Sequence, residues 1–279
     1  FRKLDLPIEK MLDLYENIAR KKGYEEKLPL HYAVSADNMK KNNIPALVKK
    51  LLMLYPESVT ELDEEGNSPL ILAAANKNCS LDVINILLDY DPDGAARKDT
   101  TYGSLPLHWA LYANLPLPSI KRIYEAYTEA TVTRNSNENK TPLAFGLASK
   151  ITNVETIQFL LDVSPKAATF SESFQPKRES PRKRHRGVWP LHRVAMHYKM
   201  YKSVASKILS IFPEAGMYKT EEGKTPISIA MDNEAYEFVS IMIQQCPEEA
   251  KHIVGDRNRT PLQRAVELQQ ESLVKLLLG

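Results

Sequence analysis

Glycine and cysteine are both scarce in this chain of 279 residues. The two cysteines, Cys79 and Cys246, form no motif with each other or with a histidine, so we expect two ordinary thiols rather than a disulfide framework or a zinc site. The 10 glycines are scattered and build no glycine-rich loop of the kind that holds phosphate. A Gly-x-Ser-x-Gly nucleophile motif is absent as well. The sequence thus predicts a protein that is not an enzyme and that carries neither cofactor nor metal.

Neither sign of charge dominates, and no long apolar run occurs. Thirty-seven Lys and Arg residues face 35 Asp and Glu residues, for a formal net charge of +2, so the overall charge selects no class of partner. An uninterrupted apolar run of about 18 residues, which a membrane span needs, is missing. The first residue is Phe1, so a targeting signal is not in view. We expect a cytoplasmic or nuclear location, and an organelle stays open.

Proline, by contrast, is plentiful, and it recurs at matching places. Seven short strings centre on a proline, with 35 to 48 residues from one to the next. Proline suits the first turn of a helix, where its missing N–H costs nothing. A second apolar segment at helical spacing follows, as at Val83, Ile84, Leu87 and Leu88. Each unit is therefore predicted to be a pair of helices. The signature prolines are Pro29, Pro69, Pro106, Pro142, Pro190, Pro226 and Pro261.

The end of each second helix is marked by another recurring proline. A proline cannot continue a helix and so acts as a stop signal. Small residues and then a polar turn follow, as at residues 63–66, where glycine supplies the turn geometry. The third unit has Thr128 at the equivalent place. The stop prolines are Pro56, Pro92, Pro165, Pro213 and Pro247.

Helix, short connection, helix and turn, repeated about every 36 residues, describe a one-dimensional solenoid. The strings resemble the ankyrin repeat, whose signature is Thr-Pro-Leu-His-x-Ala. Four copies keep Thr or Ser before the proline, and three keep the histidine. The resemblance covers nearly the whole chain. It implies an all-α ankyrin-repeat solenoid with short hairpin-like turns, in a single domain over 1–279 with an N-terminal half repeat at 1–27. It also implies that the three histidines hold neighbouring repeats in register; these are His31, His108 and His192.

In ankyrin-like stacks the turn tips and the exposed side of each first helix line a concave groove, and this implies a row of binding residues. The third residue after each signature proline looks like a groove position. Aromatic residues and Arg dominate the hot spots of protein interfaces. The alternative is that these side chains fold inward and complete the packing between repeats, above all at Leu72, Phe145 and Ile229. The predicted protein-binding residues are Tyr32, Leu72, Trp109, Phe145, Arg193 and Arg264, in a row that also holds Ile229.

A basic cluster lies in the insert at 170–188, which makes one repeat about a dozen residues longer than the others. Between residues 177 and 186 there are six basic residues and one acid, for a net charge of +5. Such a run can contact an acidic protein, a nucleic acid or an anionic surface. Equally, loops are where repeat proteins tolerate insertions without a function. The six basic residues are Lys177, Arg178, Arg182, Lys183, Arg184 and Arg186.

These features favour a non-catalytic scaffold that binds another protein, an acidic one if the insert takes part. One alternative is the binding of nucleic acid or an anionic surface through the insert. Another is the regulatory ankyrin region of a larger enzyme or channel, because the start at Phe1 and the apolar last segment suggest a piece of a longer chain. Ankyrin stacks serve so many processes that the fold does not name the partner or the pathway.

Overall fold

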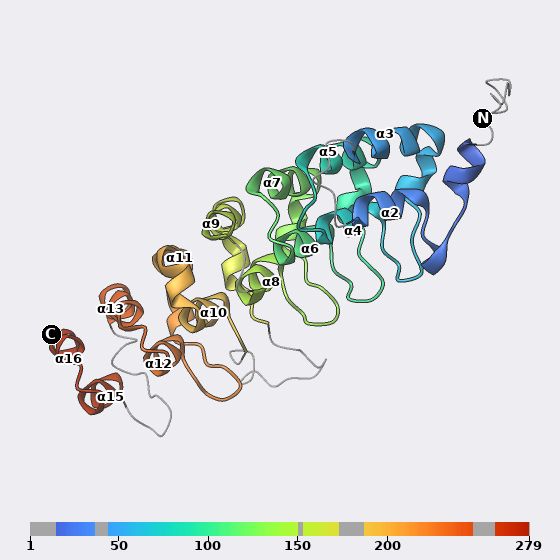
Figure 1. The fold of residues 1–279 in the computed structure, drawn as a ribbon. Helices are drawn as coiled ribbons and strands as arrows, with labels where there is room; N and C mark the ends of the chain where they lie inside the picture. The colour runs from blue at the N-terminus through green and yellow to red at the C-terminus, as the bar shows by residue number, and fades with distance from the viewer. Residues whose placement is uncertain (1–14, 37–43, 150–152, 173–186, 248–259, 279) are drawn as a thin grey trace, which may run out of the picture. The chain divides into compact units, whose positions relative to one another are not determined.

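The computed structural model describes residues 15–36, 44–149, 153–172, 187–247 and 260–278 (Figure 1). Over these ranges the chain is helical and contains no β-strand, which confirms the predicted all-α class. The chain divides into two compact units. The first comprises residues 1–130 and 135–137, and the second comprises 131–134 and 138–279.

Each signature proline is the first residue of a short inner helix, as predicted. In the first unit these are α2 (Pro29–Ser35), α4 (Pro69–Ala75) and α6 (Pro106–Tyr112). In the second unit they are α8 (Pro142–Ser149), α10 (Pro190–Met196), α12 (Pro226–Asp232) and α15 (Pro261–Glu267).

The second, outer helix of each repeat covers the predicted apolar segment. The first unit contains α3 (Ile44–Leu54), α5 (Leu81–Tyr90) and α7 (Leu117–Ala126). The second contains α9 (Val154–Val163), α11 (Tyr198–Ile211), α13 (Tyr236–Gln245) and α16 (Glu271–Leu278). Residues 15–20 are helical too, and the half repeat at 1–27 stays a prediction.

The stop prolines do more than end the outer helices, because each of the first four begins a 3-10 helix. Proline has the φ angle that the first position of such a turn needs, and its missing N–H leaves no donor unpaired there. The 3-10 helices are η1 (Tyr24–Glu26), η2 (Pro56–Val59), η3 (Pro92–Ala96), η4 (Thr128–Val132), η5 (Pro165–Thr169) and η7 (Pro213–Gly216).

The inner helices begin with two kinds of side-chain cap, and α15 has both, because Thr260 and Gln263 each accept the backbone N–H of the other. Where the residue before the signature proline is Ser or Thr, its hydroxyl accepts a hydrogen bond from the backbone N–H three residues on, as Ser68 does from Ile71. Where that residue is apolar, a histidine three residues on accepts from its backbone N–H instead, as His31 Nδ1 does from Leu28 over 3.1 Å. Leu105 with His108, and Trp189 with His192, repeat the second arrangement.

The apolar caps and their histidines also join one repeat to the next. Leu28 and Leu105 are 1% exposed and so belong to the core. His31 Nε2 lies 3.1 Å from the carbonyl oxygen of Glu61, and His192 Nε2 lies 3.0 Å from that of Tyr218; both oxygens belong to the following repeat. The register role that the resemblance implied is thus confirmed for His31 and His192.

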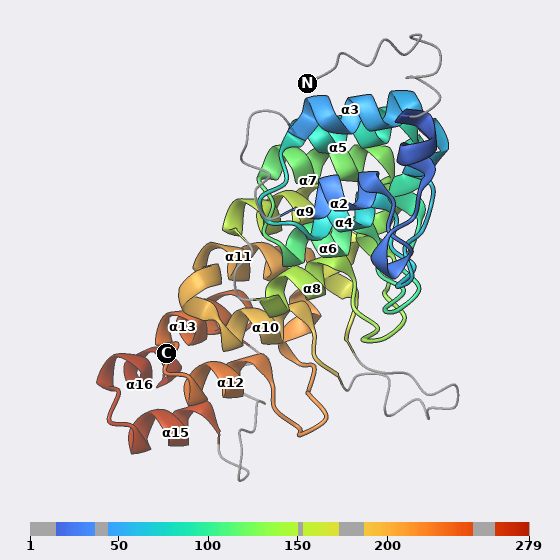
Figure 2. The same cartoon turned by 45° about the vertical axis from the view of Figure 1, so that its right-hand side comes forward.

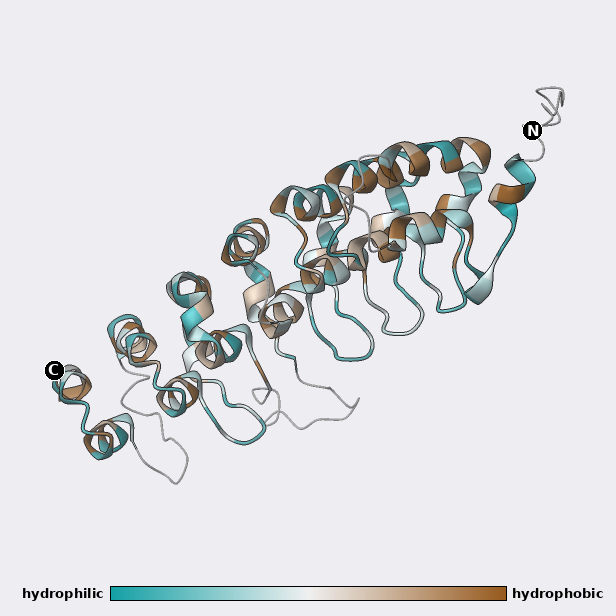
Figure 3. Ribbon diagram, in the orientation of Figure 1, coloured by the Kyte–Doolittle hydropathy of each residue, from teal (hydrophilic) through white to brown (hydrophobic). Residues whose placement is uncertain are grey.

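Within each unit, inner helices pack against inner helices and outer helices pack against outer helices. In the first unit α4 packs against α2 and α6, while α5 packs against α3 and α7 (Figure 2). In the second unit α10 lies between α8 and α12, and α11 lies between α9 and α13. Figure 3 shows apolar residues concentrated on the helices and polar ones on the connecting loops. Leu52, Ile84 and Leu87, for example, are at most 1% exposed, and burial of such a side chain stabilises the fold by about 1.5–3 kcal/mol.

The hairpin turns of the first unit contact one another at their tips. Glu64 donates its backbone N–H to the carbonyl of Glu25, and Ser136 donates to that of Tyr102. Gly66 and Gly103 have φ angles of 75° and 61°, which disfavour other residues. A Cβ atom at Gly66 would lie 2.0 Å from Thr100, and one at Gly103 would lie 2.1 Å from Ser136. Glycine therefore serves both the turn and the close approach of the next hairpin.

Candidate protein-binding face

The inner helices of the first unit expose a face without charge. Residues three and six positions after each signature proline lie on the same side of a helix, and in this unit each of them is exposed or half-buried. We call them the first-unit inner face. Because α2, α4 and α6 pack side by side, this face continues from one repeat to the next. Its members are Tyr32, Ser35, Leu72, Ala75, Trp109 and Tyr112.

Trp109 is the centre of an aromatic cluster on this face. Its ring makes edge-to-face contacts with Tyr102 and Tyr112, with centroids 5.6 and 6.0 Å apart. Tyr102 is 43% exposed and Tyr112 is 53% exposed. Such pairs add about 0.5–1.5 kcal/mol to what burial provides. The cluster is therefore held in place while much of its apolar surface faces solvent.

A buried carboxylate fixes the orientation of the Trp109 ring. Asp99, which is 3% exposed, accepts a hydrogen bond from the indole Nε1 over 2.9 Å. The same carboxylate accepts from the backbone N–H groups of Tyr102 and Ser104 in the hairpin turn. Trp109 thus connects α6 to the hairpin before it, and one side chain contributes both to the fold and to the exposed face.

Tyr32 is placed in a similar way on α2. It is 44% exposed, and its hydroxyl donates to the carbonyl oxygen of Tyr24 in the preceding turn over 2.9 Å. Leu72, between Tyr32 and Trp109 in the row, is half-buried. None of the three is folded fully inward, so the first unit presents its part of the predicted row to solvent.

The second unit continues the row with different chemistry. Phe145 is half-buried, with the ammonium of Lys140 5.9 Å from its ring centroid. Ile229 is only 5% exposed, as the inward-packing alternative required. The remaining two positions, Arg193 and Arg264, are charged.

Both arginines are paired inside the second unit. Arg193 forms a bidentate pair with Glu172, with N–O distances of 2.9 and 2.6 Å, and the Glu172 side chain is 5% exposed. This hydrogen bonding raises the pKa of Arg193. Arg264 contacts one carboxylate oxygen of Asp232 at 2.9 Å, and Lys224 contacts the other at 2.8 Å.

Sequence reasoning did not identify the partners that fix these side chains. Asp99 and Glu172 lie in turns, where acids are ordinarily solvated, and their burial depends on how the hairpins fold back. Tyr112 could have been found, because it lies one helical turn after Trp109. The insert residues Lys177, Arg178, Arg182, Lys183, Arg184 and Arg186 lie outside the described residues, so their predicted role stays a prediction.

The remaining candidates for chemistry are buried groups with structural partners. Burial lowers the pKa of His31, and it lowers that of His192 to about 4, so both rings are neutral at pH 7. Burial raises the pKa of the Cys79 thiol to about 12, which keeps it protonated and unreactive. Across the described ranges, no group of three or more His, Cys, Asp or Glu side chains is arranged to hold a metal ion.

Comparison with known families agrees with the repeat geometry. A family model for ankyrin repeats, three copies long, matches residues 30–133 and 191–279, which is more than half of the chain. The chain belongs to the ankyrin-repeat family. The ankyrin fold is generally an interaction module rather than a catalytic one, since its stacked repeats present extended surfaces for binding. No helix in the described part of this ankyrin protein combines the length and apolarity needed to span a membrane.

Solved structures support the same fold. The ankyrin repeat domain of Bcl-3, described as a unique member of the IkappaB protein family, is 18% identical in sequence to this chain. The match covers 91% of this chain and 100% of that domain, with a TM-score of 0.63. At this level of identity the likeness concerns the fold. No match was found among curated proteins.

Proposed function

We propose that this ankyrin protein is a non-catalytic scaffold that binds a partner protein through the first-unit inner face. The supporting observation is the exposed cluster of Tyr102, Trp109 and Tyr112, which continues through Leu72 to Tyr32. Exposed aromatic side chains that are already fixed in position lose little conformational freedom on binding. Tyr and Trp are also the residue types that contribute most at the centres of protein interfaces.

The charged row of the second unit favours the same assignment. Arg193 and Arg264 already contact carboxylates of their own unit, so a partner would have to compete with those ion pairs. Binding through the first unit requires no such exchange. Phe145, Arg193 and Arg264 remain predicted contacts, and their contribution should be smaller than that of Tyr32, Leu72 and Trp109.

The test compares two tyrosines with similar exposure on different faces. Tyr112→Ala removes an exposed ring from the first-unit inner face, and Tyr90→Ala removes one, 39% exposed, from the end of the outer helix α5. Partners captured by the wild-type chain from extract of the source cells would be identified and then titrated against each variant. We expect Tyr112→Ala to weaken binding by about tenfold, a typical effect at an interface hot spot, and Tyr90→Ala to leave it unchanged.

A third variant tests whether the partner binds through the first-unit inner face or through the basic insert. Neutralising the six basic residues from Lys177 to Arg186 should leave the binding of the captured protein within about twofold, because the proposed contact is apolar. Equal losses from Tyr112→Ala and Tyr90→Ala would contradict the proposal. So would binding that disappears with the insert alone and depends steeply on salt, since that pattern indicates electrostatic binding of a polyanion.

A further inference from the structure

The tips of the first two hairpins carry unbalanced negative charge. Residues 21–27 and 61–67 contain six acids against three lysines, for a net charge of −3. Two of these lysines are already paired with acids of the same hairpins. Glu64 and Glu65, which we call the acidic tip, are exposed, and neither is in an ion pair among the residues that the structure describes. Their charge is therefore available to another molecule.

Hydrogen bonds attach the acidic tip to the aromatic cluster of the next repeat. The carbonyl oxygen of Glu65 accepts from the hydroxyls of Thr100 and Thr101, over 2.9 and 3.3 Å. Thr101 directly precedes Tyr102, whose ring packs against Trp109. The backbone of the acidic tip is thus fixed against the segment that carries an exposed ring of the cluster.

On its other side the acidic tip contacts the preceding repeat. The backbone N–H of Glu64 donates to the carbonyl oxygen of Glu25 over 3.0 Å. Tyr24, next to Glu25, is 80% exposed, and its carbonyl oxygen accepts from the Tyr32 hydroxyl. In Figure 1 the hairpins of the first unit lie side by side along the inner helices. An uncharged row on the inner helices is therefore accompanied by acids at the hairpin tips.

One hairpin of the second unit has the two acids without the exposed rings. Glu221 and Glu222 precede a turn glycine as Glu64 and Glu65 do, and both are exposed. Lysines at positions 219 and 224 flank them in sequence. The inner helix that follows has Ile229, only 5% exposed, where the first unit has Tyr32. These two glutamates therefore provide a matched control for the acidic tip.

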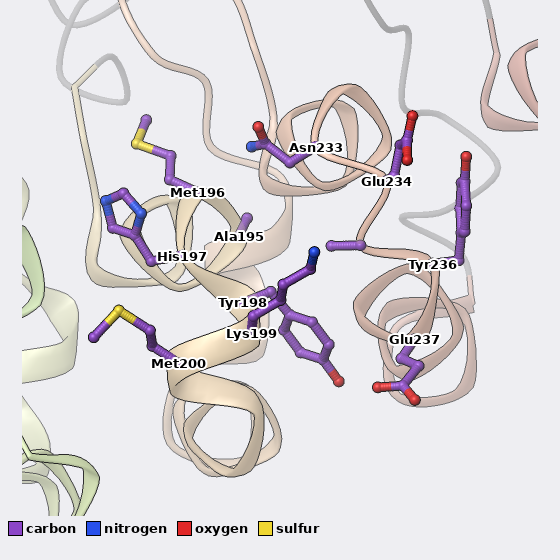
Figure 4. Close-up of a pocket in the computed structure, with 11 residues that line it drawn as sticks. Ala195, Met196, His197, Tyr198, Lys199, Met200, Asn233, Glu234, Tyr236 and Glu237 are labelled. Carbon is purple, nitrogen blue, oxygen red and sulfur yellow. The ribbon is translucent and has the colours of Figure 1, made fainter. Parts of the chain in front are cut away.

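A cleft of about 500 Å³ in the second unit also differs from the acidic tip in charge. It lies between the start of α11 and the turn that joins α12 to α13. Figure 4 shows Lys199 on the α11 side and Glu234 and Glu237 on the other. Glu237 is already paired with Lys202. The lining thus combines both signs of charge and does not select a cation.

The spacing of the inner helices favours a helical occupant for the first-unit inner face. Packed helices lie about 8–10 Å apart, and α2, α4 and α6 pack side by side. Side chains seven residues apart on a helix share a face and are separated by about 10.5 Å. An extended strand covers that distance in about three residues, whose side chains point to opposite faces. A helix can therefore present one apolar side chain to each repeat.

We propose that the first-unit inner face binds an amphipathic helix of a partner protein, with Lys or Arg along the flank that faces the acidic tip. This inference rests on the proposed function and adds the chemistry of the partner. The apolar side of the helix packs on Tyr32, Leu72 and Trp109. Cations are also attracted to aromatic rings, so the acids and the rings select the same sign of charge.

The test titrates the full chain into two labelled peptides of about 18 residues, long enough to form a helix. Both carry leucine at heptad a and d positions, and the flanking positions are lysine in one peptide and glutamate in the other. Fluorescence anisotropy measures the affinity at low and at high salt. We expect the lysine peptide to bind about tenfold more tightly, because like charges oppose association. High salt should reduce this difference.

Two double variants assign the charge preference to the acidic tip. Glu64→Gln with Glu65→Gln removes both charges and keeps the side-chain shape. It should weaken binding of the lysine peptide by about fivefold, as expected for the loss of two exposed ion pairs. Glu221→Gln with Glu222→Gln makes the same change in the second unit and should leave the affinity unchanged.

Tyr112→Ala separates this inference from the proposed function. If it weakens both peptides by about tenfold but the wild type binds them equally, the face is a binding site and the cationic helix is overturned. If it weakens neither, the proposed function itself is contradicted. The inference also fails if the lysine peptide shows no saturable binding. Tighter binding after neutralisation of the insert would overturn it too, because the chain's own basic segment would then be the occupant.

Discussion

The inner faces of the two units differ in chemistry although the same repeat builds both. In the first unit, the third and sixth positions after each signature proline are uncharged, and the row includes Tyr32, Trp109 and Tyr112. In the second unit the same positions include Arg193, Asp232 and Arg264, which are tied into ion pairs. Residues at equivalent positions thus provide exposed apolar surface in one unit and internal electrostatic contacts in the other. Position in the repeat does not by itself decide exposure, since Ile229 is buried where Tyr32 is exposed, and at the exposed positions the residue type determines which contacts are made.

The largest effect is expected from removing the buried acid of the second unit. Glu172→Gln leaves the guanidinium of Arg193, whose side chain is 22% exposed, without its charged partner. Loss of one member of a buried pair is strongly destabilising, and we expect about 3 kcal/mol less unfolding free energy. In a Trp109→Phe background, Trp189 is the single tryptophan, and its fluorescence follows the second unit during urea titration.

The control for this prediction is an exposed ion pair in the same unit. Lys202→Gln breaks the contact with Glu237, and both side chains are at least 60% exposed. Such pairs contribute little because water and salt screen them. The urea midpoint of Lys202→Gln should therefore match that of the parent. Equal shifts for Glu172→Gln and Lys202→Gln would show that the second unit does not depend on its buried pair.

A smaller effect is expected from acid, through the histidine that caps α10. The pKa of His192 is about 4 in the folded chain and about 6.5 in an unfolded one. Between these values the unfolded chain binds more protons, so stability falls as the pH is lowered. From pH 7.5 to pH 5, His192 alone should reduce the unfolding free energy by about 2 kcal/mol. Urea titrations followed by Trp189 fluorescence at several pH values measure this slope.

Replacement of His192 by Gln identifies the source of the slope. In α15, the Oε1 atom of Gln263 accepts the backbone N–H of Thr260 over 2.9 Å, so glutamine can keep the cap. It cannot titrate, and it loses the ring contact with the carbonyl of Tyr218. The His192→Gln variant should therefore have a lower unfolding free energy at pH 7.5. That free energy should also change less with pH between pH 6.5 and pH 4. An unchanged slope would assign the acid sensitivity to other groups.

The smallest predicted effect is a difference in stability loss between glycine substitutions in the hairpins of the two units. Gly66, Gly103 and Gly223 all have positive φ, so an Ala at any of them is strained by about 1–2 kcal/mol. At Gly66 and Gly103 a Cβ would also collide with the neighbouring hairpin, whereas at Gly223 nothing lies within 4 Å. Gly103→Ala should thus lose about 1 kcal/mol more than Gly223→Ala in urea unfolding. Equal losses would mean that the hairpin of Gly103 moves away from Ser136 without cost.

Much of the fold could be predicted from the sequence because proline has so few conformational options. The seven signature prolines marked the starts of inner helices, and Pro56, Pro92, Pro165 and Pro213 marked the ends of outer ones. The 3-10 helices after these stops were not predicted, since a stop signal does not say how the chain turns. The start of α11 at Tyr198 was not predicted either, because the apolar spacing of residues 198–201 merges with that of the rest of the helix.

The candidate site could be predicted only as a set of positions. Repeat spacing identified Tyr32 and Trp109, which the structure places on an exposed face. It could not show that Ile229 is buried or that Arg193 is paired, because both depend on contacts between segments distant in sequence. The residue type did not distinguish the two roles either, since arginine serves binding surfaces and ion pairs equally well.

The two alternative caps of the inner helices limit how the repeats can diverge by single substitutions. A copy capped by Ser or Thr and one capped by histidine differ at two positions, as Ser68 and Ile71 differ from Leu105 and His108. One intermediate between them has neither cap and leaves the first turn of the helix unsatisfied. The other has both, as in Thr-Pro-Leu-His. That doubly capped string is the signature of the family, and from it either cap can be lost in one step that leaves the other in place.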